Sequence, residues 1–104
     1  MKSEVKNTEK EYLEKLMNRI VSLRKSKGIS QEKLAIESEI ARSLMRGYER
    51  KERNISFANL IRIIKFGLDM SVEDFFKEGF DKEANYTVFS KVEPKTKKKA
   101  SVRK

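Results

Sequence analysis

The sequence predicts an all-α fold built from five short helices. The first observation is the spacing of apolar residues over 9–26, where Leu13, Leu16, Met17 and Ile20 recur every three or four positions among charged residues. This spacing is typical of an amphipathic helix that packs one face on a core. The second observation is that the later apolar segments are short and are bounded by serine and glycine, which favour helix starts and stops. No long alternating segment predicts a sheet.

Each predicted helix has a boundary that the sequence supports. The first ends before Gly28, the usual place for a left-handed helix stop. Ser30, Ser56 and Ser71 are candidate N-caps, and Asp74 lies three residues after Ser71 as in a capping box. The predicted helices are 9–26, 31–37, 42–50, 57–66 and 72–78. The side chains expected in the core include Leu34, Ala35, Ile40, Met45, Tyr48, Leu60, Ile61, Ile63, Ile64, Val72 and Phe75.

The two ends of the chain differ in composition from the predicted domain over 9–80. Residues 1–8 are polar and are expected to form a flexible N-terminal arm. Residues 81–90 form an extension that could contribute to a dimer contact, and the stretch 84–92 fits a strand or an extended wrap equally well. Residues 91–104 carry seven basic residues and one acid, which predicts a disordered basic tail. That tail either aids solubility or attracts phosphates non-specifically.

Composition limits the function. The 104 residues include 25 Lys+Arg and 16 Asp+Glu, a net charge of +9, so a negatively charged partner is the first to consider. Cysteine and histidine are absent, which excludes disulfides, thiol nucleophiles, zinc fingers and imidazole chemistry but leaves carboxylate-only metal sites and carboxylate acid/base pairs open. Because the sequence also lacks a phosphate-binding glycine loop and a paired-carboxylate motif, we expect no enzyme, cofactor, metal or small-molecule ligand. No apolar run approaches the roughly 18 residues that cross a bilayer, so a soluble cytoplasmic protein is expected.

Two motifs in the middle of the chain carry a family resemblance. GISQEKLA opens the second predicted helix, and ARSLMRGYE forms the third. The string LRKSKGISQEKLAIESEIARSLMRGYERKERNISFANLIRII, followed by GLDMSVEDFF, resembles the helix-turn-helix of the phage repressor and Cro family, also called the XRE family. The resemblance covers about 17–76 and implies a compact five-helix lambda-repressor-like domain, a prokaryotic or phage origin, and double-stranded DNA as the partner. The stretch ERKERNIS is also similar to a segment of restriction–modification controller proteins.

The chain departs from the family pattern at several positions. Glu39 replaces the usual turn glycine, so it must adopt a left-handed conformation, at about 1 kcal/mol, or the turn is altered. Ala41 replaces the usual Ser or Thr cap of the third helix, which gives up about 1 kcal/mol of capping. Lys51 and Ile55 replace a glycine and a proline, and IIKFGLDMS is one residue longer than is typical. None of these departures removes a core anchor, so they affect the loops and not the predicted fold.

The third helix supplies the residues expected to read DNA bases. In the family, the N-terminal part of this helix faces base edges in the major groove. The matching positions are Arg42, Ser43, Arg46 and Gly47, and an arginine can donate two hydrogen bonds to guanine. Gly47 either permits close approach to DNA or is a tolerated defect, and Leu44 either touches a thymine methyl group or completes the core. Without the family context, arginines spaced four apart would indicate only a solvated helix face.

Other basic and polar residues are expected to bind the phosphate backbone or to stabilise the domain. Arg24 and Glu49 match a family ion pair that links the first helix to the third. The start of the second helix and the loop after the third helix are the places where the family contacts phosphates. The candidate phosphate contacts are Gln31, Lys33, Arg50, Lys51, Arg53 and Asn54.

A homodimer is expected because one recognition helix touches only a few base pairs. Such domains usually read two half-sites about 10 base pairs apart. The fifth helix offers the aromatic residues Phe75, Phe76 and Phe80, and Tyr86 and Phe89 are further candidates for the same face. Phe75 is expected to close the monomer core, whereas Phe76 and Phe80 are the better candidates for a dimer interface.

The leading hypothesis is a sequence-specific, dimeric regulator of transcription. A phage-type repressor, a restriction–modification controller and an antitoxin-like autoregulator would use the same DNA chemistry, so the sequence does not separate them. A non-catalytic adaptor or coactivator with the same fold would retain its function after Arg42→Ala and Arg46→Ala. A non-specific nucleic-acid binder that uses the basic tail would lose binding when residues 91–104 are deleted.

Overall fold

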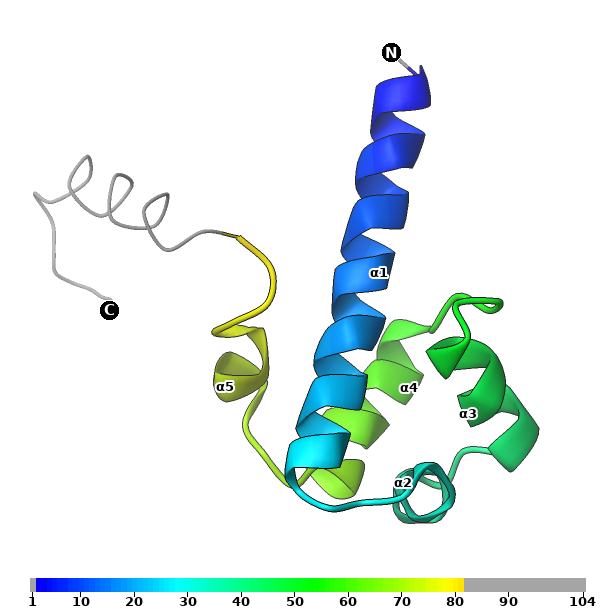
Figure 1. The fold of residues 1–104 in the computed structure, drawn as a ribbon, viewed down its shortest axis with the longest axis vertical. Helices are drawn as coiled ribbons and strands as arrows, with labels where there is room; N and C mark the ends of the chain where they lie inside the picture. The colour runs from blue at the N-terminus through cyan, green and yellow to red at the C-terminus, as the bar shows by residue number, and fades with distance from the viewer. Residues whose placement is uncertain (1, 82–104) are drawn as a thin grey trace, which may run out of the picture.

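The computed structural model describes residues 2–81, and Figure 1 shows how their helices surround the C-terminal half of the first helix. The elements are α1 (Lys2–Ser26), α2 (Gln31–Ser38), α3 (Arg42–Glu49), α4 (Phe57–Arg62), the π-helical segment η1 (Ile63–Gly67) and α5 (Val72–Phe76). The all-α prediction is confirmed, and residues 2–81 contain no strand. The predicted basic tail and the predicted extension beyond Asp81 lie outside the described residues. None of the described helices is long and apolar enough to cross a membrane.

Helix α1 begins much earlier than expected. Residues 2–8 continue the helix, so the prediction of a flexible arm over this stretch is wrong. The stretch contains neither glycine nor proline, its two lysines and one glutamate are good helix formers, and Glu4 in the first turn suits the helix dipole. Residues 3–12 are exposed, and this end of α1 stands clear of the other helices in Figure 1. The sequence therefore forms a helix there without help from packing.

Serine caps fix the starts of three helices, as predicted. The hydroxyl oxygens of Ser30, Ser56 and Ser71 accept hydrogen bonds of 3.0–3.1 Å from the backbone N–H three residues later. These bonds satisfy donors that the first helical turn leaves without a partner. Helix α3 lacks such a bond because its N-cap is Ala41.

The departures from the family pattern are absorbed locally. Glu39 adopts the left-handed conformation (φ 57°, ψ 48°), and its carbonyl accepts a hydrogen bond of 3.2 Å from Arg62. Lys51 is also left-handed, with φ 65°. The extra residue of the stretch IIKFGLDMS is taken up by η1, because a π-helical turn holds one more residue than an α-helical turn. The helix predicted over 57–66 is therefore an α-helix to Arg62 followed by a π-helical turn.

The core lies between the C-terminal half of α1 and the other helices. Its buried residues are Met17, Ile20, Leu34, Ala35, Ile40, Met45, Tyr48, Leu60, Ile63, Ile64, Leu68 and Phe75. Segment η1 packs closely on α2, because a side-chain carbon added at Gly67 would lie 2.6 Å from Leu34 Cδ1 and would also clash with the Ser38 hydroxyl. Gly67 is thus needed for close helix approach. Its expected role as a helix stop is also met, since η1 ends there.

Ser38→Ala is expected to raise the free energy of unfolding by about 1 kcal/mol. Ser38 is only 1% exposed, and its hydroxyl has no hydrogen-bond partner among the described residues. Removing a buried polar group without a partner removes a desolvation penalty and leaves little empty volume. Urea denaturation checks the change, with Ser30→Ala as the control, because loss of that N-cap should lower stability by about 1 kcal/mol. A destabilised Ser38→Ala variant would contradict this account of the contact between α2 and η1.

Candidate DNA-binding surface

Helix α3 separates an apolar face from a basic face. Met45 and Tyr48 are buried, whereas Arg42, Arg46 and Arg50 are exposed and follow one another at four-residue spacing. This arrangement follows from the helical period, since residues four apart share a face. Ser43 is also exposed. Helix α3 therefore presents Arg42, Ser43 and Arg46 on its exposed side, where they could reach base edges.

The two arginines expected to read bases differ in their surroundings. Arg42 forms an ion pair of 2.9 Å with Glu32 in the first turn of α2, and both side chains are exposed. Arg46 has no ion pair within residues 2–81. Because exposed pairs contribute under about 1 kcal/mol, Glu32 orients Arg42 without preventing it from binding another acceptor. Leu44 is partly buried against the core, which resolves its open assignment in favour of packing.

Gly47 does not face solvent, which corrects the expectation that it contacts a base. It is buried, and a side-chain carbon added there would lie 2.7 Å from Cγ of Arg53. Its carbonyl accepts hydrogen bonds from the backbone N–H of Glu52 (2.9 Å) and of Arg53 (3.3 Å). Gly47 is therefore neither a surface for DNA nor a defect. Its missing side chain lets the loop after α3 fold back over the helix.

A hydrogen-bonded network centred on Glu49 holds α1, α2 and α3 together. Arg24 binds both carboxylate oxygens of Glu49, at 2.8 and 2.9 Å, in the ion pair that the family resemblance implied. Arg24 also donates to the carbonyl of Ile29 at 2.9 Å. The Gln31 amide donates to Glu49 at 3.0 Å, a link that the sequence reasoning missed because it assigned Gln31 to phosphate alone. The network ties α1 and the start of α2 to the C-terminal residue of α3.

The loop between α3 and α4 is basic and exposed. Gln31 is half-buried, and the other five candidate phosphate contacts are exposed. These five are Lys33, Arg50, Lys51, Arg53 and Asn54. Four of these five belong to residues 50–54, which the structure brings together because they are consecutive. Lys33 lies apart from them, in the first turn of α2. The end of the loop is fixed by a hydrogen bond of 2.8 Å from Asn59 to the Tyr48 hydroxyl.

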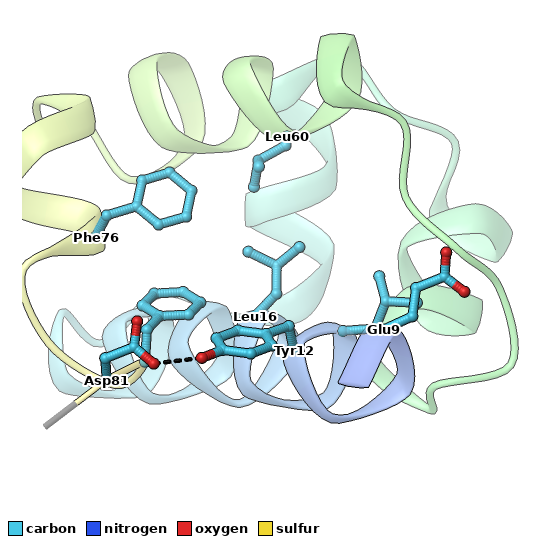
Figure 2. A pocket seen from close by; sticks show the side chains of 8 residues that line it. Glu9, Tyr12, Leu16, Leu60, Phe76 and Asp81 are labelled. Carbon is cyan, nitrogen blue, oxygen red and sulfur yellow. Dashed lines mark hydrogen bonds between the residues drawn. The ribbon is translucent and has the colours of Figure 1, made fainter. Parts of the chain in front are cut away.

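The aromatic residues near α5 line a groove on the side of α1 away from α3. Phe75 is buried, as expected, and the Phe76 ring lies 4.9 Å from the Phe75 ring and 5.0 Å from the Phe80 ring. Figure 2 shows Phe76 across the groove from Tyr12, whose hydroxyl donates to Asp81. The groove has a volume of about 480 Å³ and is lined by Glu9, Tyr12, Leu13, Leu16, Leu60, Phe76, Phe80 and Asp81.

Two basic residues of α1 anchor the chain that follows α5, and the sequence reasoning missed both. Arg19 donates to the carbonyls of Phe75 (2.7 Å) and Asp74 (2.9 Å), so it caps the end of α5. Lys15 donates to the carbonyl of Phe80 at 2.8 Å. Helix α5 therefore ends at Phe76, two residues before its predicted end at Glu78. The only signal in the sequence was the placement of two cations beside the apolar stripe of α1.

Comparison with known proteins agrees with this geometry. A family profile described as helix-turn-helix matches residues 20–67, which contain α2 and α3. The chain is 37% identical to the wild-type restriction–modification controller protein C.Esp1396I, over 62% of this chain and 83% of that one, with a TM-score of 0.60. It is 39% identical to the controller protein C.AhdI from Aeromonas hydrophila, over 62% of this chain and 96% of that one, with a TM-score of 0.56. A tetramer of C.Esp1396I in complex with its natural 35 base-pair operator is 38% identical, over 62% and 84% of the two chains, with a TM-score of 0.60. A comparison with curated proteins gave no match.

Proposed function

The chain belongs to the XRE-type family of helix-turn-helix DNA-binding proteins, and from this premise we propose that it regulates transcription by binding an inverted-repeat operator as a homodimer. The observation that carries the proposal is the exposed Arg42 and Arg46 face of α3, held in place by the Glu49 network. The family is one of non-catalytic regulators, which agrees with the expectation that the chain is not an enzyme. Its similarity to two restriction–modification controllers favours a controller role, in a bacterial or phage cytoplasm.

Base recognition follows from the chemistry of the α3 face. A guanidinium group can donate two hydrogen bonds to O6 and N7 of guanine in the major groove. Arg46 has no ion pair to break within the described chain, so it is the stronger of the two candidate readers. Ser43 lies between the two arginines on the exposed side and can donate or accept a single hydrogen bond. Gly47 is left out of this set because Arg53 covers it.

Phosphate binding is assigned to the surroundings of α3. Residues 50–54 and Lys33 supply exposed donors, and the start of α2 adds the free N–H groups of a helix N-terminus. The Gln31 side chain is held by Glu49, so its role toward DNA is to keep the start of α2 in place. These contacts set affinity and register but carry no sequence information.

Selection from a pool of random duplexes at about 150 mM salt tests the proposed function. The full-length protein should enrich an inverted repeat whose half-sites are centred about 10 base pairs apart. A retained pool without any preferred sequence would overturn the assignment of α3 as a reading helix. It would leave the basic tail or a protein partner as the basis of function.

The homodimer is assigned to the apolar groove beside α5. Phe76 is 38% exposed at the edge of the groove, next to the half-buried Phe80. Exposed aromatic residues around an apolar depression are typical of interaction sites. The occupant we propose is a second copy of the chain, because an inverted repeat requires two reading helices related by a two-fold axis. Helix α5, which carries Phe76 at the edge of the groove, and α3 lie on different sides of α1 (Figure 1), so a partner seated on Phe76 leaves α3 free.

Phe76→Asp is expected to weaken the homodimer at least tenfold, because a carboxylate at a buried apolar contact loses its hydration. Sedimentation equilibrium at about 1–50 µM measures the change, because this range brackets the Kd of a dimer of micromolar affinity. The control is Ile36→Asp on α2, which introduces the same charge at a side chain that is 60% exposed and lies outside the groove. A wild-type protein that stays monomeric with and without operator would contradict the dimer assignment.

A further inference from the structure

A small basic pocket lies between α1 and the loop that follows α3. Its volume is about 90 Å³. Leu13 and Met17 form its apolar floor, and Glu14 is its one acidic residue. The remaining lining residues are Lys10, Lys51, Arg53 and Asn54, so three cations from two separate parts of the chain converge there. Two of these cations belong to the loop already assigned to phosphate binding, whereas Lys10 comes from α1.

The exposed end of α1 continues this basic surface. Lys6 lies four residues before Lys10, so the two side chains leave the helix about 40° apart, on the side that faces the pocket. Both lie in the stretch 3–12, which is exposed along its whole length and which projects beyond the other helices in Figure 1. The early start of α1 therefore places Lys6 on the same helix as Lys10, a support that a flexible arm over residues 1–8 would not give.

The two sides of α1 use their cations differently. On the side of α5, Lys15 and Arg19 are engaged by backbone carbonyls and by the carboxylates of Glu11 and Glu78. On the side of the α3–α4 loop, neither Lys6 nor Lys10 forms an ion pair within residues 2–81. Lys6 and Lys10, which form no ion pair within the described residues, thus lie on the side of α1 that adjoins the proposed DNA-binding loop, with Glu14 beside them.

We propose that the N-terminal end of α1 is a second element that grips the DNA backbone, with Lys6 and Lys10 binding phosphates next to those bound by Lys51 and Arg53. This inference rests on the proposed function and extends it to a part of the chain that precedes the helix-turn-helix match. Charge complementarity decides the occupant, because a row of unpaired lysines beside a phosphate-binding loop suits a second stretch of the same phosphodiester chain. Lysine acts here as a point charge, so these contacts carry affinity and no base preference.

The test couples individual lysines to individual phosphates on the selected operator. Lys6→Gln/Lys10→Gln should make the slope of log K against log salt shallower by about 1.8, or about 0.9 for each lysine. Each phosphate is then replaced, one at a time, by an uncharged methylphosphonate. At some phosphates this replacement should lower the affinity of the wild-type protein but not that of the double variant. These phosphates should lie next to the ones coupled to Lys51 in the same scan.

The charge-matched control compares Lys10→Gln with Lys77→Gln, which removes one exposed lysine just after α5, on the other side of α1. Lys77→Gln should leave both the slope and the methylphosphonate profile unchanged. An unchanged slope in Lys6→Gln/Lys10→Gln, or a loss that no single phosphate accounts for, would overturn the inference. Failure of the wild type to select any operator would instead refute the proposed function, so the two failures are distinguishable.

Discussion

Replacing Glu49 with alanine is expected to lower the free energy of unfolding by about 3–5 kcal/mol. The side chains of Arg24 and Glu49 are only 12% and 7% exposed. Removal of the carboxylate leaves the Arg24 charge buried and breaks the hydrogen bonds from Arg24 and Gln31. Because small domains have about 5–15 kcal/mol of stability in total, the variant should be close to unfolding at 37 °C.

Urea denaturation measures this effect, and Glu32→Ala is the matched control. Glu32 also pairs with an arginine, Arg42, at 2.9 Å, but both side chains are exposed, so its loss should cost under about 1 kcal/mol. The double variant Arg24→Met/Glu49→Met should recover much of the loss, because it removes the charge that Glu49→Ala leaves unpaired. Equal and small losses for Glu49→Ala and Glu32→Ala would contradict the structural role of the network.

Arg46→Ala is expected to reduce affinity for the selected operator by about 1–3 kcal/mol, which is roughly a five- to 150-fold increase in Kd. The loss should be confined to particular base pairs, because a bidentate arginine discriminates guanine from the other bases. Affinity for random duplexes should change far less. Arg42→Ala should act in the same way at a different base pair, and titration of the variants against both kinds of duplex measures the difference.

Lys51→Ala provides the contrast for Arg46→Ala. It removes a cation from the loop beside α3, so it should lower the affinity for selected and random duplexes alike. It should also reduce the slope of log K against log salt by about 1. If Arg46→Ala behaved as Lys51→Ala does, with equal losses on both duplexes, Arg46 would be a phosphate contact. Base reading by α3 would then have to rest on Arg42 and Ser43.

Local signals in the sequence were sufficient for the helices that carry them. The caps at Ser30, Ser56 and Ser71 depend on bonds to residues only three positions away, so the sequence could place them. The start of α1 could not be placed, because residues 2–8 are mostly polar and carry no apolar stripe that would mark them as helical. The π-helical turn was visible only as an extra residue whose position in the fold was unknown.

The site shows the same division between local and long-range information. The basic face of α3 follows from its helical period, and the Arg24–Glu49 pair from the family resemblance. The cover of Gly47 by Arg53 depends on how the loop folds back, which no spacing indicates. The capping of α5 by Arg19 joins residues more than fifty positions apart, so only the tertiary structure could show it.

The central claim is that α3 reads guanines in the major groove through Arg42 and Arg46. The most direct measurement replaces each guanine of the selected operator, one at a time, by 7-deazaguanine, which removes the N7 acceptor but keeps the base pair. We predict that replacing at least one guanine in each half-site lowers the affinity of the wild-type protein for the operator. The same replacement should leave the affinity of Arg46→Ala unchanged, because that variant already lacks the side chain that binds N7. An operator that binds equally well with every guanine replaced would contradict major-groove reading by these arginines.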